Sequence, residues 1–250
     1  MIKNKYWFFK SALSKELCEK IIALGLGKIQ LEKLKGINTK AKTFGDMEKS
    51  LDKNLSLKDN TLQDIKDKDL NNYYVRDSEV TWFTDKWIYD EIIPYINIAN
   101  AAAGWKYNID SFEPFQFTVY SSPGGFYGWH NDMDSDHNSI IKRYIYGITE
   151  TPLKKDGGMP FGYSKNEDNI GKVRKLSLTI NLTEPENYEG GNLKFDFGSH
   201  IKGEQFVECI EARNQGTIIV FPSYLHHCVT PVTKGTRCSL VLWCSGEPLK

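Results

Sequence analysis

The pattern of apolar and polar positions divides the chain near Phe115. Before this point apolar residues recur three and four positions apart, which is the spacing of one face of a helix. The first such stretch follows Ser14, a residue type that favours helix N-caps. We expect this helix to end at Gly25 and Gly27, because glycine is a common helix terminator.

A charged, poorly periodic stretch separates this helix from the next. Residues 31–70 are rich in Lys, Asp and Asn, and they predict a solvated loop region with at most one short helix. The second helix is expected to begin near Thr84 or Asp85 and to run through an apolar segment to Trp105. Pro94 lies inside it and should kink the helix or split it in two.

Beyond Phe115 the periodicity changes from helical spacing to alternation. Short runs rich in β-branched and aromatic residues alternate at period two, and glycine-containing turn signals lie between them. The expected strands are 115–120, 139–150, 175–183, 192–197, 204–212, 216–221 and 237–244. Such a series without intervening helices predicts an antiparallel jelly roll.

The fold class is therefore α+β, mainly β, with N-terminal helices packed against the jelly roll. We interpret residues 1–250 as a single domain, with a helical portion at 1–110 and the jelly-roll core at 111–250.

Composition excludes several other classes of protein. Lys and Arg together number 32, as do Asp and Glu, so no overall charge attracts the chain to nucleic acid or to an anionic membrane. No run approaches the ~20 apolar residues that cross a bilayer, and the start does not resemble a signal peptide. The five cysteines lack zinc-type spacing and are expected to be free thiols in the cytoplasm.

Two histidine segments in the β-rich half are candidates for a metal site. His130 and Asp132 are two apart on an extended segment, so both can face one ion. Alone this pair is weak and is equally typical of a surface His beside an Asp. His227, which follows the strand at 216–221, adds a second imidazole. Two imidazoles and one carboxylate form the facial triad of non-haem Fe(II) oxygenases, although zinc accepts the same ligands.

Arg237 lies on an apolar strand, ten residues after His227. A buried arginine needs an anionic partner, which is either an acid on a neighbouring strand or a ligand carboxylate. Ser239 is two positions further on and faces the same way, so both side chains can hold one carboxylate. Beside the triad, a ligand carboxylate is the better account.

In combination these segments resemble a known family. The H-x-D pair, followed by HCVTPVTKGTR at 227–237, resembles the prolyl 4-hydroxylase-like branch of the 2-oxoglutarate/Fe(II) dioxygenases. The preceding GTIIVFPS at 216–223, YEGGNL at 188–193 and the tyrosine-containing approach to His130 are similar to the same family. The resemblance covers residues 115–243.

The resemblance implies a role for each matching residue. His130, Asp132 and His227 match the iron ligands, Arg237 matches the partner of the distal carboxylate of 2-oxoglutarate, and Tyr120 matches a tyrosine that hydrogen-bonds this cosubstrate. Ser239 joins this group from strand geometry alone. The implied cofactors are Fe(II) and 2-oxoglutarate, with ascorbate as a candidate reductant.

The implied reaction is hydroxylation of a C–H bond, with 2-oxoglutarate and O₂ converted to succinate and CO₂. The resemblance favours a prolyl residue of a peptide or protein as substrate, with no nucleic-acid or membrane partner. Two alternatives stay open, namely the same chemistry on a free amino acid or other small molecule and a cupin-like metal protein that does not use 2-oxoglutarate. The long segment at 149–173 is a candidate substrate loop.

Neighbouring residues leave choices within the site. His226 adjoins His227, but adjacent strand residues point to opposite faces, and spacing within the family motif selects His227. Asp134 lacks the H-x-D relation to His130, and His137 and His200 are expected at the surface. Trp129 and Trp243 are expected either to line the pocket or to belong to the core.

Overall fold

The computed structural model describes residues 4–41, 76–133, 140–143, 163–164, 167, 170–198 and 205–248. Its described α-helices are α1 (Lys15–Leu34) and α4 (Lys86–Ala102). The strands are β1 (Trp7–Phe9), β2 (Lys40–Ala41), β3 (Arg76–Phe83), β4 (Ser111–Phe112), β5 (Phe115–Ser121), β6 (Phe126–His130), β7 (Lys142–Arg143), β8 (Tyr163–Ser164), β9 (Val173–Asn181), β10 (Tyr188–Gly190), β11 (Leu193–Asp196), β12 (Phe206–Glu208), β13 (Ile218–Pro222), β14 (His226–Val229) and β15 (Val232–Gly246).

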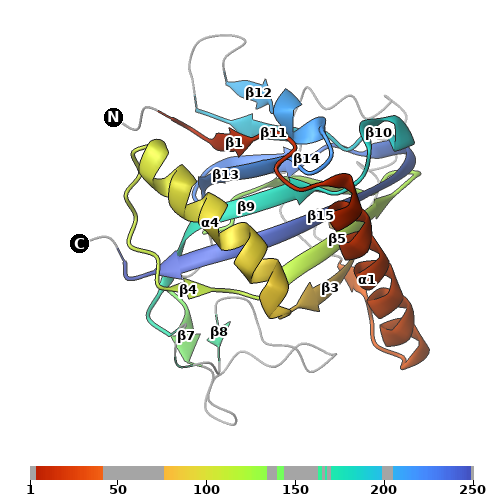
Figure 1. Ribbon diagram of the computed structural model, residues 1–250, viewed down its shortest axis with the longest axis horizontal. Coiled ribbons are helices and arrows are strands. Elements are labelled where there is room, and N and C mark those ends of the chain that lie inside the picture. The colour runs from red at the N-terminus through yellow and green to blue at the C-terminus, as the bar shows by residue number, and fades with distance from the viewer. Residues whose placement is uncertain are drawn as a thin grey trace, which may run out of the picture.

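One curled antiparallel sheet dominates the molecule. Its strand order is β1-β13-β9-β15-β5-β3-β6-β14-β11-β12. In addition, β2 pairs with β3, and β4 and β10 pair with β15. β3 joins the two halves of the sheet, because its residues 79–83 pair with β5 while Arg76 and Asp77 pair with β6. Both helices lie against the broad layer that contains β9, β15 and β5 (Figure 1). The predicted class, a mainly β jelly roll with packed N-terminal helices, is confirmed.

The helix α1 begins where the sequence predicts but ends later. The Leu17 amide donates to the Ser14 hydroxyl at 3.2 Å, which makes Ser14 the N-cap. The helix then continues through both glycines to Leu34, so the predicted end at Gly25 was wrong. Gly25 is buried against the ring of Phe117, where a side chain would overlap that ring. Here glycine serves close packing and does not terminate the helix.

The helix α4 is a single helix, although Pro94 lies inside it. Proline removes one backbone hydrogen bond from a helix interior. Packing offsets this loss, because Ile88, Ile92 and Ile96 are completely buried along one face. The helix is therefore not split at Pro94, which was one of the two outcomes predicted from the sequence.

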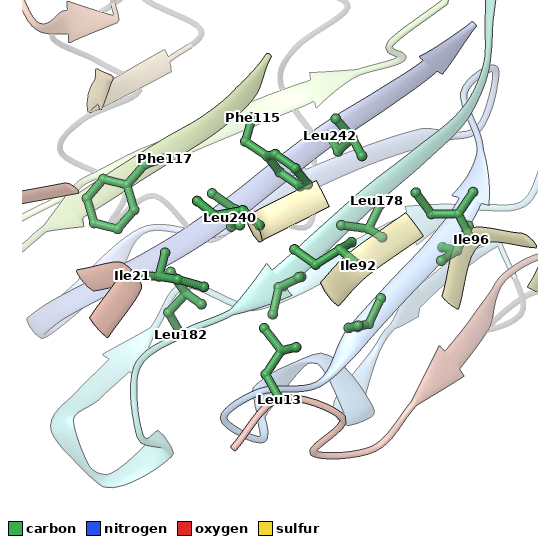
Figure 2. Packing of buried hydrophobic residues seen from close by; sticks show 14 of the residues in the cluster. Leu13, Ile21, Ile92, Ile96, Phe115, Phe117, Leu178, Leu182, Leu240 and Leu242 are labelled. Carbon is green, nitrogen blue, oxygen red and sulfur yellow. The ribbon is translucent and has the colours of Figure 1, made fainter. Parts of the chain in front are cut away.

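The alternation of β15 shows how the core and the cavity lie on opposite sides of the same strands. Cys238, Leu240, Leu242 and Cys244 belong to the core beneath the helices. The intervening residues Arg237, Ser239, Val241 and Trp243 line a cavity on the other face. Leu240 and Leu242 belong to the same core cluster as Ile21 of α1 and Ile92 and Ile96 of α4 (Figure 2). The larger core thus supports the cavity from behind.

Several strands were not predicted. β1, β2 and β3 lie within residues 1–110, which the sequence indicated to be helical or loop, and β6 and β14 carry both candidate histidine ligands. In the stretch expected as a strand at 204–212, only Phe206–Glu208 is extended, and a 3₁₀ turn follows at Ile210–Arg213. Most of the predicted strand at 139–150, of the 31–70 stretch and of the 149–173 segment lies outside the described residues.

All five cysteines are buried and free, as expected from their spacing. Neither α1 nor α4 is long and apolar enough to span a membrane.

Candidate metal centre and adjoining cavity

Three predicted ligands converge at the junction of three strands. His130 ends β6, and it lies directly opposite His227 of β14 in the antiparallel register. The chain turns after His130, and the amide of Asp132 donates to the Ser223 carbonyl at 2.9 Å, which ties this turn to the end of β13. One ligand atom from each of the three residues lies within 4.8 Å of the others.

Backbone carbonyls fix the orientation of both imidazole rings. Nδ1 of His130 lies 2.8 Å from the Gly128 carbonyl oxygen, and Nδ1 of His227 lies 2.9 Å from that of Leu225. Because a carbonyl oxygen can only accept, each ring must donate from Nδ1 and keep its lone pair on Nε2. The Nε2 atoms lie 3.7 Å and 3.6 Å from the two carboxylate oxygens of Asp132.

Burial sets the protonation states that metal binding requires. Burial and the proximity of His227 lower the pKa of His130 to about 3, so its imidazole is neutral near pH 7. Burial alone would raise the pKa of Asp132, but His227 and His130 outweigh this effect and hold it below its usual value. Asp132 is therefore a carboxylate, and the site offers the neutral imidazole of His130 and one anion beside His227.

Aromatic side chains enclose the ligands. The ring of Tyr127 stacks on His130 with a centroid distance of 3.5 Å and an interplanar angle of 14°. Phe221 approaches His227 edge-on at 4.7 Å. These rings restrict the motion of the imidazoles and exclude water from one side of the site.

The predicted cosubstrate residues line the same cavity as the three ligands. Arg237 is 2% exposed and lies opposite Tyr120 in the register of β15 and β5, and its guanidinium carbon is 5.6 Å from the Tyr120 ring. Ser239 also lines the cavity and is buried, with 1% of its surface exposed. Gly191 leaves room for Arg237, because a Cβ there would lie 2.9 Å from the arginine Cδ.

Arg237 has an unused donor. Its Nη1 is buried and has no hydrogen-bond partner among the described residues. A structural salt bridge to a neighbouring strand, the alternative considered from sequence, is absent within that part of the chain. An unpaired guanidinium nitrogen beside a cavity is costly and fits a site for a ligand anion.

The remaining candidates separate as follows. His226 is exposed and lies outside the cluster of ligand atoms that contains His227. Trp243 lines the cavity, whereas Trp129 packs against Phe206 with a centroid distance of 5.3 Å. Asp134, His137 and His200 lie outside the described residues.

Sequence reasoning missed one arginine that lines the cavity and another that packs behind its wall. Arg76 comes from the unpredicted strand β3 and lines the cavity. Arg174 packs behind Trp243, with its guanidinium 4.2 Å over that ring, and forms a bidentate pair with Glu113 through two nitrogen–oxygen distances of 2.6 Å. The run Val80–Phe83, rich in strand-forming residues, was the available signal for β3.

The family follows from comparison with known proteins. Residues 115–245, more than half of the chain, match the model of the 2OG-Fe(II) oxygenase superfamily. The chain belongs to this superfamily. Fe(II) and 2-oxoglutarate are therefore its cofactors, as the sequence resemblance implied, and the cupin-like alternative without 2-oxoglutarate loses support.

Curated relatives match over shorter segments. A PKHD-type hydroxylase of Alteromonas mediterranea is 44% identical over 68 residues, which is 27% of each chain. A PKHD-type hydroxylase of Shewanella baltica is 36% identical over 94 residues, or 35% of this chain and 38% of that protein. The match thus spans only about a quarter to two-fifths of the length of these relatives.

Solved structures share the fold at low sequence identity. The viral collagen prolyl hydroxylase vCPH of Paramecium Bursaria Chlorella virus-1 aligns with a TM-score of 0.53 and 18% identity, over 98% of this chain and 97% of that one. A Pseudomonas putida prolyl-4-hydroxylase gives a TM-score of 0.53 and 14% identity, over 98% and 95%. These likenesses establish the jelly-roll oxygenase fold.

Proposed function

We propose that His130, Asp132 and His227 hold Fe(II), and that Arg237 binds the distal carboxylate of 2-oxoglutarate. One observation carries the proposal: the three converging donor groups and the unpartnered Nη1 of Arg237 line a single cavity. With metal–ligand bonds of about 2.1 Å, two donors on one ion lie roughly 3–4 Å apart. The distances of 3.6 Å and 3.7 Å to the carboxylate of Asp132 fit this range.

Each residue contributes a definite group to this site. His130 and His227 direct the Nε2 lone pair inward, because Nδ1 of each ring donates to a backbone carbonyl. Asp132 supplies the negative charge beside the metal. Tyr120 and Ser239 offer hydroxyl groups on the same cavity face as Arg237, and together they suit one carboxylate.

When bound, Fe(II) and 2-oxoglutarate supply an O₂-dependent oxidation that hydroxylates a C–H bond and releases succinate and CO₂. Within the class of hydroxylases, a prolyl residue of a peptide or protein is the proposed substrate. The curated relatives are named hydroxylases, and two solved structures of the same fold are named prolyl hydroxylases, which supports this choice. The proposal treats residues 1–250 as a single domain, with ascorbate as the reductant.

Two measurements test the proposal. Anaerobic addition of Fe(II) and 2-oxoglutarate should give a weak metal-to-ligand charge-transfer band, which His130→Ala and Arg237→Ala should diminish. Succinate release should then rise with one or more members of a panel of proline-containing peptides, and mass spectrometry should show the gain of one oxygen. A wild-type protein with no such band would contradict the ligand assignment, and a silent peptide panel would contradict the prolyl substrate alone.

A further inference from the structure

The cavity contains a second buried arginine, whose partners are all neutral. Arg76 is 7% exposed. Its Nε donates to the Ser78 hydroxyl at 2.9 Å, and its Nη2 donates to the Gln116 side-chain oxygen at 2.8 Å and more weakly to the Thr118 hydroxyl at 3.4 Å. No acid among the described residues forms an ion pair with it. Arg76 is thus a buried cation that the described residues solvate but do not neutralise.

The guanidinium of Arg76 lies beside the proposed metal centre. Its central carbon is 4.6 Å from the ring centroid of Tyr127, and that ring also stacks on His130. Nη1 takes part in none of the hydrogen bonds of Arg76, and it is not among the described buried nitrogens that lack a partner. This nitrogen is therefore accessible, and it can donate to a molecule in the cavity that Arg76 lines.

Arg76 and Arg237 occupy different levels of the cavity. Arg237 lies opposite Tyr120, whereas Arg76 donates to Gln116 and Thr118, which lie four and two residues earlier on the same face of the same strand. At ~3.3 Å per residue, these strand positions lie roughly 7–13 Å from Tyr120. A single small dicarboxylate that is held by Arg237 and by the metal leaves Arg76 free for another molecule.

A charge balance indicates what that molecule carries. In the loaded site, the double charge of Fe(II) and the charge of Arg237 balance Asp132 and the two carboxylates of 2-oxoglutarate. The charge of Arg174 is balanced by Glu113, its partner at 2.6 Å. Only Arg76 stays uncompensated among the described charges of the cavity, and a bound anion would remove this cost.

We propose that Arg76 binds a carboxylate of the substrate, so that the hydroxylated residue carries a free carboxylate. Trp243 offers a second donor in the same cavity, because its Nε1 is buried without a partner. This inference rests on the proposed oxygenase function and narrows its substrate class. It selects a free amino-acid derivative or the C-terminal residue of a peptide over a residue inside a chain.

Matched acids and amides test this inference by binding alone. The anaerobic protein is loaded with Fe(II) and 2-oxoglutarate, and its melting temperature is measured with N-acetyl-L-proline, N-acetylglycine and N-acetyl-L-leucine and with the three corresponding amides. At least one acid should bind more than about tenfold more tightly than its amide, as expected for one charge-assisted pair. Arg76→Gln should abolish this difference, and Arg76→Lys should retain part of it.

Equal binding of acid and amide throughout the panel would overturn the inference, and so would a preference that survives in Arg76→Gln. A raised dissociation constant for 2-oxoglutarate in Arg76→Gln, with an unchanged acid preference, would assign Arg76 to the cosubstrate instead. A peptide that ends in proline, compared with one in which the proline is internal, tests for a terminal carboxylate, and its comparison with N-acetyl-L-proline separates a peptide terminus from a free acid. The charge-transfer band of the same samples reports independently on the proposed metal and 2-oxoglutarate sites.

Discussion

His130 and His227 face each other across the β6–β14 pair, and each donates Nδ1–H to the carbonyl of the residue two positions before it in the chain. Their ring centroids lie 4.2 Å apart. The backbone therefore sets both tautomers, and no additional side chain is needed for this task. Both Nε2 lone pairs are directed toward Asp132 before any metal arrives, so the geometry is preorganised.

The adjacent histidines should differ sharply in their effect on metal binding. We expect His227→Ala to weaken Fe(II) binding more than about 100-fold, since even the loss of an outer-shell partner costs about 10–100-fold. His226→Ala removes an exposed ring outside the cluster and should leave the affinity within about threefold. Anaerobic calorimetric titration with Fe(II) measures both variants. The reverse order of effects would show that His226 is the ligand.

Replacement of Arg237 should affect the cosubstrate and spare the metal. A hydrogen bond to a charged group contributes roughly 1.5–3 kcal/mol, which corresponds to a loss of about 10–100-fold in affinity for 2-oxoglutarate in Arg237→Ala. Arg237→Lys keeps the charge and loses the bidentate geometry, so it should be intermediate. Titration of the charge-transfer band with 2-oxoglutarate gives the affinities. An unchanged value in Arg237→Ala would remove the assigned role.

The metal-free protein should lose stability as the pH falls from about 6.5. Unfolded His130 has its ordinary pKa, whereas burial and His227 lower the folded value to about 3. Between these values only the unfolded state binds the proton, so acid favours unfolding by up to about 1.4 kcal/mol per pH unit. Below about 3 this contribution stops changing. The lowered pKa of Asp132 acts in the same direction at the acid end of the range.

Urea denaturation at pH 7, 6, 5 and 4 with a chelator present measures this slope. His130→Asn should flatten it, while His226→Asn, in which an exposed ring is replaced, should retain it. Identical slopes in the wild type and in His130→Asn would show that His130 is not the group that resists protonation.

Much of the fold could be predicted from the sequence, because apolar and polar residues alternate along the strands together with their burial. In β15, apolar residues pack under the helices while Arg237 and Ser239 face the cavity, and this period of two is visible in the sequence. The strand β3 was missed because charged residues occupy its first half, from Arg76 to Glu79. Their environment depends on pairing with β5 and β6, which local sequence does not specify.

The residues of the site likewise fall into those that the sequence predicted and those that it did not. The convergence of His130, Asp132, His227 and Arg237 on one cavity could be expected because they belong to short motifs with fixed spacing. Arg76 could not, because its position beside Tyr127 arises from register between strands that lie some fifty residues apart in the chain. The pair of Arg174 and Glu113 likewise joins segments 61 residues apart. Such contacts depend on how the strands are arranged in the fold, and no local sequence pattern predicts them.

The Glu113–Arg174 pair should stabilise the wall of the cavity. Both side chains are largely buried, at 15% and 18% exposure. Glu113→Gln leaves a buried guanidinium without its anion and should lower the free energy of unfolding by about 3 kcal/mol. The additional change Arg174→Gln should restore part of this loss. Asp90→Asn, at the exposed pair with Lys86, is the matched control and should cost less than about 1 kcal/mol.

Two glycines of α1 offer a test of the packing between helix and sheet. Alanine is favoured over glycine inside a helix by roughly 1 kcal/mol. Gly27→Ala should gain this stability, because nothing lies within 4 Å of the new Cβ. Gly25→Ala should instead destabilise by about 1–3 kcal/mol, because its Cβ overlaps the ring of Phe117, which is completely buried beneath the helix. Chemical denaturation of the two variants gives opposite signs if α1 packs directly on β5, and equal gains would mean that the helix stands away from the sheet at this point.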